Sequence, residues 1–203
     1  GIAATAIFTH PGLQEMRIVE ATPEALIIVA EAGVAAPKLA RYAANHDLEG
    51  AEFLAGIPGT VGGALAMNAG CYGSETWEHV IGAELIGRDA GVATHDPAAF
   101  DIGYRHVALK EGELGVDEWF AAAWFGFERG DGEAARRRVK ELLQQRISAQ
   151  PLALPNAGSV FRNPPGDHAA RLIEACGLKG YAIGGARVSE KHANFIVNAQ
   201  GRG

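Results

Sequence analysis

The sequence predicts a mixed protein of strands and helices in two parts. Before residue 130, short runs of β-branched and aromatic residues alternate with glycine-rich connections. From residue 131 the pattern becomes that of a long helix, whose apolar residues recur at helical spacing: Ala135, Val139, Leu142, Leu143 and Ile147. We therefore expect one domain over residues 1–130 and a second over residues 131–203.

Local patterns predict the individual elements. Proline is tolerated at the first helical position, so Pro37 marks a helix start, and glycine after a helix marks its end, as at Gly177. The strand over residues 118–127 is expected to be buried on both faces. In order, the expected elements are strands at 17–19 and 26–29, a helix at 37–46, a short helix capped by Ser74, a hairpin at 81–95, a strand at 118–127, the boundary helix, a helix capped by Asp167 and a strand at 194–198.

Composition narrows the class of protein. The chain has 203 residues, of which 48% are hydrophobic and 21% charged, as in ordinary globular proteins. Its formal charge of −6 argues against a sequence-independent nucleic-acid binder, and the arginine run at 136–138 is interpreted as a solvated helix face. The two cysteines, Cys71 and Cys176, form no Cys-x-x-Cys motif. No spacing of His, Cys, Asp or Glu indicates a metal site.

The stretch from Gly56 to Gly73 is the most informative part of the chain. It holds six glycines and one proline, and it has no charged residue. A glycine in a folded interior costs about 0.5–1 kcal/mol of backbone entropy, so a stretch with this many glycines requires a structural or functional explanation. One explanation is a tight loop packed under a sheet. The density favours instead a loop that cradles phosphate, ribose or a flat ring.

This stretch lacks both common nucleotide fingerprints, Gly-x-Gly-x-x-Gly and Gly-Lys-Ser/Thr. It closely resembles the flavin-binding loop of the UDP-N-acetylenolpyruvoylglucosamine reductases, although Cys71 stands where that family usually has a small residue. The resemblance implies substrate contact by Tyr72. It implies FAD contacts by a larger set: Gly56, Ile57, Pro58, Gly59, Thr60, Val61, Gly62, Gly63, Ala64, Asn68 and Gly70.

A second motif is Asp101-Ile-Gly-Tyr-Arg105. Taken alone, it reads as a surface arginine whose stem packs on Tyr104. The same family carries a Tyr-Arg pair, and the resemblance implies that Arg105 holds the enolpyruvyl carboxylate, with Tyr104 also at the substrate. A guanidinium suits this role because it pairs bidentately with a carboxylate. Val107 departs from the Ser or Thr that is usual there.

Two further matches lie in the second part, over residues 155–164 and 185–198. The first resembles the family motif whose serine is the proton donor, which implies this role for Ser159. The resemblance also implies substrate contacts by Arg162, Asn163 and His192, although a lone histidine is more often structural.

Taken together, the resemblance implies an α+β fold, with an FAD-binding domain of the vanillyl-alcohol-oxidase type followed by a smaller substrate-binding domain. It implies a bacterial, cytoplasmic and monomeric enzyme that uses FAD and NADPH to reduce UDP-N-acetylglucosamine enolpyruvate to UDP-N-acetylmuramate, with no nucleic-acid or membrane partner. Two alternatives remain open: another FAD oxidoreductase of this fold, and a noncatalytic nucleotide-binding module.

The sequence at both ends of the chain is interpreted as that of a fragment that lacks both termini. The family's pyrophosphate-binding loop is expected before residue 1, and its C-terminal glutamate beyond residue 203. Residues 1–203 alone are therefore expected to purify colourless and to be inactive.

Overall fold

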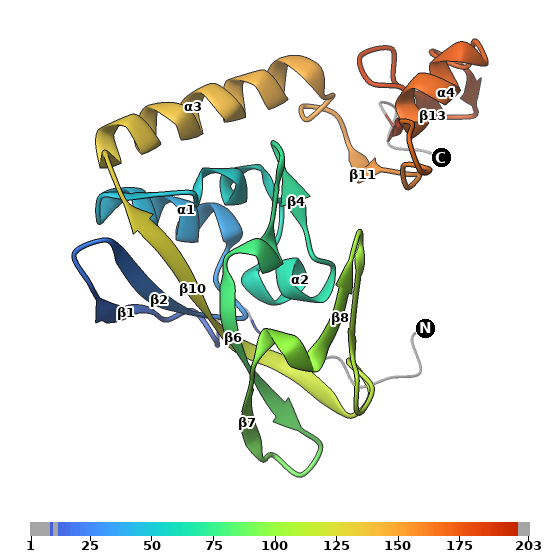
Figure 1. Cartoon of the computed structure of the whole chain (residues 1–203). Helices are drawn as coiled ribbons and strands as arrows, with labels where there is room; N and C mark the ends of the chain where they lie inside the picture. Colours follow the sequence, from blue (N-terminus) through green and yellow to red (C-terminus); the bar gives the residue numbers. More distant parts are fainter. Residues whose placement is uncertain (1–8, 10–11, 199–203) are drawn as a thin grey trace. The chain divides into compact units, whose positions relative to one another are not determined.

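The computed structural model describes Thr9 and residues 12–198 of the chain. Two compact units are present, one ending at Leu142 and the other beginning at Leu143 (Figure 1). The division falls inside the long helix α3 (Gly132–Ala149), whereas the sequence places the boundary just before that helix. The mixed content of helices and strands agrees with the expected α+β class.

Unit 1 is built on a six-stranded antiparallel sheet with the order β1-β2-β10-β6-β7, and β3 pairs with the far end of β10. The central strand β10 pairs with both neighbours, so that Trp124 lies opposite Val29 on one side and Gly82 on the other. The strand bounds are Met16–Ala21 (β1), Ala25–Glu31 (β2), Leu48–Glu49 (β3), Val80–Gly87 (β6), Val92–His95 (β7) and Glu118–Arg129 (β10). All strands expected in this part of the chain are therefore present.

The prediction that β10 is buried on both faces is wrong for part of its length. Phe125 is fully buried, whereas Trp119 near the start of the strand is 37% exposed. Alternate residues of β10 point to opposite faces of the sheet, and the residues between the buried ones are only half-buried. Helices therefore cover one face of this strand more completely than the other.

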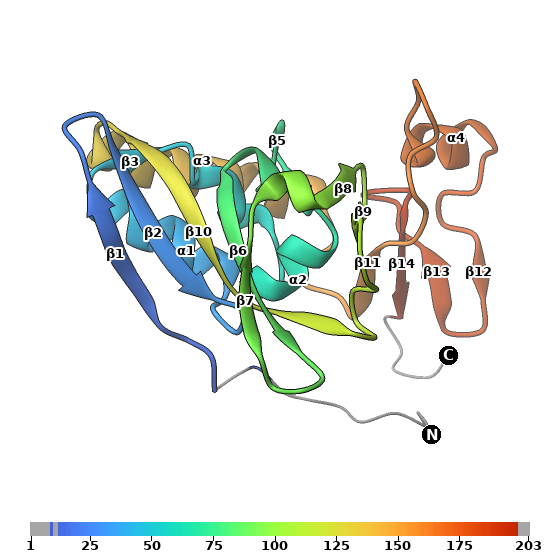
Figure 2. The same cartoon turned by 60° about the horizontal axis from the view of Figure 1, so that its bottom comes forward.

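Helices α1 (Ala36–Asn45) and α2 (Val61–Ala66) lie against the same face of the sheet (Figure 2). Helix α1 begins with Pro37 in its first turn and buries Leu39, Ala40 and Ala43, as its spacing predicts. The 3₁₀ helix η1 (Glu52–Gly56) leads from β3 toward α2. This order delivers the glycine-rich stretch to the edge of the helical layer.

Two short hairpins follow the glycine-rich stretch. One pairs β4 (Gly70–Cys71) with β5 (Ser74–Glu75), and the other pairs β8 (Phe100–Gly103) with β9 (His106–Leu109). The 3₁₀ turns η2 (Thr76–Glu78) and η3 (Pro97–Ala99) lie between them in the chain. Ser74 was expected to cap the turn that carries Trp77, but the cap is Glu75, whose backbone N–H is accepted by Glu78 at 3.0 Å.

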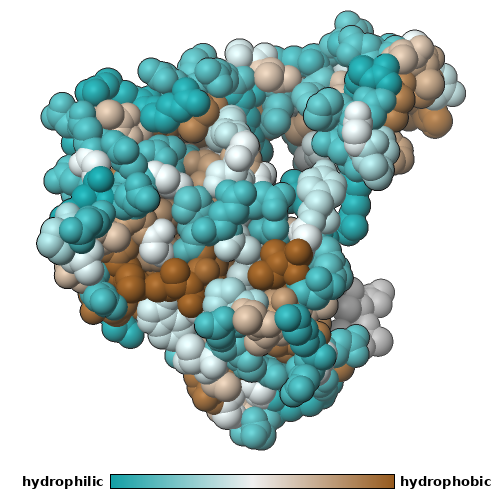
Figure 3. All heavy atoms as spheres, viewed as in Figure 1, coloured by the Kyte–Doolittle hydropathy of each residue, from teal (hydrophilic) through white to brown (hydrophobic). Residues whose placement is uncertain are grey.

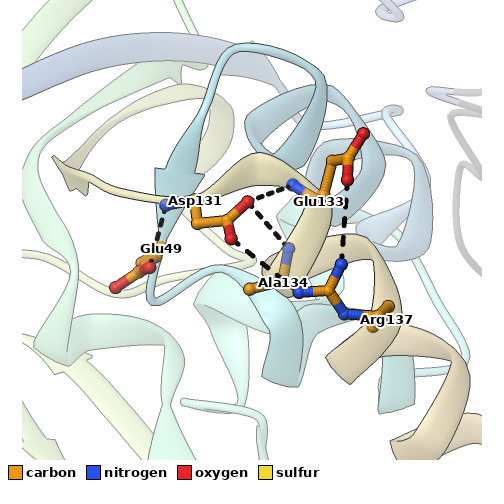
Figure 4. Close-up of polar contacts among 5 residues, drawn as sticks. All are labelled: Glu49, Asp131, Glu133, Ala134 and Arg137. Carbon is orange, nitrogen blue, oxygen red and sulfur yellow. Dashed lines mark hydrogen bonds and ion pairs between the residues drawn. The ribbon is translucent and has the colours of Figure 1, made fainter.

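Helix α3 begins at a network of polar contacts (Figure 4). Asp131 Oδ1 accepts the backbone N–H groups of Glu133 and Ala134 at 2.8 and 3.0 Å, and its own N–H donates to Glu49 at 3.0 Å. The Ala134 N–H is the largest of the causes that lower the pKa of Asp131. The first turns of α3 thus belong to unit 1, which explains why the units divide later than the sequence suggests.

Unit 2 contains a four-stranded antiparallel sheet with the order β11-β14-β13-β12, and the helix α4 (Ala169–Ala175). The strands are Asn156–Ser159 (β11), Ala182–Ile183 (β12), Ala186–Val188 (β13) and Phe195–Asn198 (β14). Gly177 ends α4 with a positive φ of 69°, as expected. Asp167 does not cap α4. It pairs with Arg171, which lowers the pKa of the carboxyl, and the first helical N–H donates to Asn163 instead.

The surface of unit 1 is mostly hydrophilic in the view of Figure 3, with smaller apolar patches around the sheet and around α2. No helix in the described part of the chain is both long and apolar enough to span a membrane. Over the same residues, no three His, Cys, Asp or Glu side chains gather as metal ligands would.

Candidate active site

The six glycines of the stretch Gly56–Gly73 divide into two groups. A Cβ on Gly56 would collide with Cys71, on Gly62 it would lie 2.9 Å from the Ala32 side chain, and on Gly70 it would lie 2.8 Å from the Ser74 carbonyl. Real Cβ atoms do not come this close to other atoms, so these three glycines are required by packing within the protein. The alternative of a tightly packed loop is therefore part of the explanation.

The other three glycines, Gly59, Gly63 and Gly73, meet no such obstacle. Within the described part of the chain, no neighbouring atom lies within 4 Å of a Cβ built on Gly59 or Gly73, and one built on Gly63 meets only Thr60 Oγ1, at 3.8 Å. Gly59 and Gly63 are exposed on either side of the half-buried Thr60. Backbone that is open and free of side chains fits the approach of a flat ring or a phosphate, and Met67, 41% exposed, adds an apolar surface nearby. These residues fit FAD.

Asn68 is 4% exposed, and its side chain is used within the protein. The amide Nδ2 donates to Glu75 at 2.7 Å and to the Gly103 carbonyl at 3.3 Å, while Oδ1 accepts the Trp77 N–H at 3.1 Å. Its φ of +40° is of the kind that asparagine tolerates. Asn68 therefore connects the glycine-rich stretch to the β8–β9 hairpin.

Arg105 lies in the two-residue turn that joins β8 to β9. Gly103 pairs with His106, so Tyr104 and Arg105 form the turn, and Arg105 has a φ of +54°. The left-handed region costs a residue with a Cβ about 1–2 kcal/mol. Among the described residues, the Arg105 guanidinium has no hydrogen bond or ion pair, and it is half-buried. Strained backbone that presents an unused charge is typical of a functional position.

A pocket of about 430 Å³ brings these two regions of unit 1 together. Its lining includes Asn68, Gly70, Cys71, Glu75, Glu78, Tyr104 and Arg105. Sequence reasoning assigned Asn68 and Gly70 to the cofactor and the Tyr-Arg pair to the substrate, and the structure places all four at one pocket. It also adds Glu75 and Glu78, which the sequence analysis did not select.

The carboxylates of Glu75 and Glu78 are engaged within the protein and so do not compete for Arg105. Glu75 accepts the Asn68 amide, and Glu78 accepts the Ser74 hydroxyl at 2.7 Å, which is the main cause of its lowered pKa. Ser74 Oγ also lies 2.9 Å from His79 Nε2. Burial lowers the pKa of His79, whose ring stacks on Phe53 at 5.2 Å. The neutral imidazole is therefore the favoured form at neutral pH.

Tyr72, expected at the substrate, has φ +58° and donates its hydroxyl to the Leu142 carbonyl of α3 at 2.7 Å. This contact fixes the β4–β5 hairpin to the helix. The substrate role of Tyr72 stays a prediction.

In unit 2, Ser159 ends β11 opposite Phe195 of β14. Its side chain is exposed and makes no hydrogen bond to any described residue. Arg162 and Asn163 follow in the same exposed segment, and Asn163 uses its oxygen to accept the Ala169 N–H at 3.1 Å. A free hydroxyl next to a cation and an amide can bind a polar ligand, but the segment by itself does not exclude water.

His192 lies in the turn before β14, which is hydrogen-bonded to the Ser159 segment through Asn194. Its Nδ1 accepts the Asn194 N–H at 3.3 Å, its ring meets Phe195 edge-on at 4.8 Å, and burial lowers its pKa. A hollow of about 550 Å³ in unit 2 is lined by the end of α3, residues 150–154, the β12–β13 region, residues 189–191 and Val197, and by none of the predicted site residues.

Comparisons with known proteins follow the same division of the chain. Residues 12–95 match the family model of an FAD binding domain, and residues 150–202 match that of the UDP-N-acetylenolpyruvoylglucosamine reductase C-terminal domain. Over 98% of its length, the chain is 55% identical to the UDP-N-acetylenolpyruvoylglucosamine reductase of Thiobacillus denitrificans. The chain belongs to the UDP-N-acetylenolpyruvoylglucosamine reductase family.

Other members of the reductase family agree. The protein of that name from Legionella pneumophila (strain Corby) is 51% identical over 99% of the chain. The crystal structure of the reductase from Thermus caldophilus superposes with a TM-score of 0.73 at 36% identity, and covers 86% of the chain. The chain spans 63%, 62% and 63% of the Thiobacillus, Legionella and Thermus proteins, respectively.

Proposed function

We propose that this chain carries out the reduction of UDP-N-acetylglucosamine enolpyruvate to UDP-N-acetylmuramate, the reaction that makes a peptidoglycan precursor. The observation that carries the proposal is Arg105, an arginine held in a strained turn with no partner for its guanidinium among the described residues. It lines a pocket with the glycine-rich stretch, and its position is the one that the family resemblance assigns to the substrate carboxylate.

Arg105 holds the carboxylate of the enolpyruvyl group in this proposal. Two parallel N–H···O bonds fix the plane of the carboxylate, and the fixed charge stabilises the negative charge that develops beside it during reduction. The engaged carboxylates of Glu75 and Glu78 leave the guanidinium available, and the Asn68 amide, bonded to the Gly103 carbonyl, holds the strand end next to the turn. Tyr104 in the β8–β9 hairpin and Tyr72 in the β4–β5 hairpin provide aromatic surface on these two hairpins.

Ser159 donates the proton. Hydride is added to the methylene carbon of the enolpyruvyl group, and the Ser159 hydroxyl gives its proton to the carbon that bears the carboxylate. A serine is a weak acid, but the accepting carbon is a strong base, and closure against water favours the transfer. Arg162, Asn163 and His192 bind the nucleotide sugar.

FAD is held along the glycine-rich stretch, where Gly59 and Gly63 leave the backbone open. When bound, it supplies hydride from its N5 position after receiving it from NADPH. We further propose that the protein is a monomer of the bacterial cytoplasm, with no nucleic-acid or membrane partner.

Purification of the gene product that contains this chain tests the proposal. We expect FAD absorbance and an NADPH oxidation that requires the enolpyruvyl UDP-sugar, with a product heavier by two hydrogens in mass spectrometry. UDP-N-acetylglucosamine, which lacks the double bond, is the control and should not be consumed. NADPH oxidation that is independent of the enolpyruvyl substrate would contradict the proposal. Flavin that survives acid precipitation, together with oxidation of an alcohol, would favour the other flavin oxidoreductase.

A further inference from the structure

We propose that Asn194 is a positioning residue for Ser159, which rests on the proposed function. Asn194 is not among the site residues expected from the sequence. The structure makes it the main polar contact between the Ser159 segment and the strand β14, through both its side chain and its backbone.

The Asn194 side-chain amide binds both backbone groups of one residue in the Ser159 segment, Phe161. Its Oδ1 accepts the Phe161 N–H at 2.9 Å, and its Nδ2 donates to the Phe161 carbonyl at 2.8 Å. The Asn194 backbone carbonyl accepts the Val160 N–H, also at 2.9 Å. Asn194 is 4% exposed, so loss of either bond would leave a buried polar group of its amide without a partner.

These bonds matter because the strand pairing around Ser159 is otherwise short. Strands β11 and β14 pair at Asn156 and at Ser159 with an irregularity between them, and Gly158 has a positive φ of 79°. Val160 and Phe161 are 45% and 58% exposed, so little apolar burial fixes them. The hydrogen bonds of Asn194 therefore extend the pairing just beyond Ser159 and fix the backbone that carries its hydroxyl.

The test compares Asn194→Asp with Val188→Ala in the gene product that contains this chain. The aspartate keeps the shape and the acceptor for the Phe161 N–H, but it turns an oxygen toward the Phe161 carbonyl. Val188 pairs with Ile196 in the same sheet and makes no hydrogen bond to residues 159–161, so its truncation controls for loss of sheet stability alone. Asn194→Ser, which is too short to span both groups, is measured alongside in case the aspartate does not fold.

We expect faster amide hydrogen exchange at Val160 and Phe161 in the Asn194 variants, and not in Val188→Ala. In rapid kinetics, Asn194→Asp should slow reduction of the enolpyruvyl sugar by about 10- to 100-fold, the cost of a misplacement near 1 Å, and leave flavin reduction by NADPH unchanged. In a Ser159→Ala background, the same change should have little further effect, since no hydroxyl is left to position.

Unchanged exchange at Phe161, an equal slowing of both half-reactions, or a full effect in the Ser159→Ala background would each overturn the inference. Failure of the proposed function is distinguishable, because the unmodified protein would then not reduce the enolpyruvyl sugar. The exchange measurement would still decide whether Asn194 holds the segment.

Discussion

Arg105 lies in the tight turn of the β8–β9 hairpin, whose open end is anchored in a buried aromatic cluster, whereas Ser159 lies at the end of a short strand with exposed neighbours. At that open end, Phe100 is 4% exposed and contacts Trp77 at a ring distance of 4.6 Å and Phe120 at 5.9 Å. Beyond Ser159, Phe161 is 58% exposed. The segments that carry the two predicted catalytic residues are thus anchored by different means. The Arg105 hairpin is packed at its base and bonded to Asn68 next to its turn, whereas the Ser159 segment depends on the hydrogen bonds of Asn194.

The difference indicates what each residue has to do. A guanidinium that binds a carboxylate gains from a rigid, preorganised position, because no energy is then lost to rearrangement when charge develops. A proton donor needs a defined direction and a site closed to water, and unit 2 by itself supplies only the direction. We therefore expect the role of Ser159 to be sensitive to substitution of the polar residues that hold its segment. The role of Arg105 should instead be sensitive to the geometry of its own side chain.

The largest expected effect is that of Ser159→Ala. Removal of a positioned acid should lower turnover by about 10²–10⁴-fold, with the loss confined to reduction of the enolpyruvyl sugar. Stopped-flow measurement of the two half-reactions separates the steps. Slowing of both half-reactions alike, or of neither, would refute the role of Ser159.

Arg105→Lys keeps the charge and removes the two-pronged geometry, so turnover should fall by about 10²-fold. Arg105→Asn is the matched control for stability, since asparagine tolerates a positive φ. It should be as inactive as the lysine variant or more so, with no loss of melting temperature. Near-normal turnover with lysine would mean that a point charge is sufficient.

Asn68→Asp should have a smaller effect on turnover, about tenfold, because it loosens the Arg105 turn from a distance. The loss of the two amide donors, with a carboxylate placed against Glu75, should also cost about 1–3 kcal/mol of stability. The double variant with Arg105→Lys decides between two roles. Non-additive losses indicate positioning of Arg105, whereas loss of FAD absorbance by Asn68→Asp alone would indicate a direct cofactor contact.

The smallest expected effect concerns pH and compares His79 in unit 1 with His192 in unit 2. Burial lowers the pKa of both in the folded protein, so the unfolded chain takes up protons first as the pH falls below about 6.5. Stability should therefore fall with pH in that range. His79→Gln and His192→Gln should each flatten the dependence of melting temperature on pH, and an unchanged slope in both would contradict the assignment.

Much of the fold could be predicted from the sequence because its signals are local. Pro37 correctly marked the start of α1, and the hairpin expected at 81–95 is the one formed by β6 and β7. The glycine-rich stretch could be recognised as special in the same way. Arg105 and Ser159 became candidates through the family resemblance, since residue type alone does not distinguish Arg105 from an ordinary surface arginine.

The tertiary structure decided which atoms those groups face. Asn68 and Gly103 are 35 residues apart, and Phe161 and Asn194 are 33 apart, so no local pattern records that they bind each other. Nor does the sequence distinguish Gly62, which is confined by Ala32, from Gly63, which faces open space. The division within α3 was likewise settled by contacts between distant residues, such as that of Asp131 with Glu49. Short-range periodicity specifies where a chain bends and which face is apolar, but hydrogen-bond partners depend on the register in which distant segments meet.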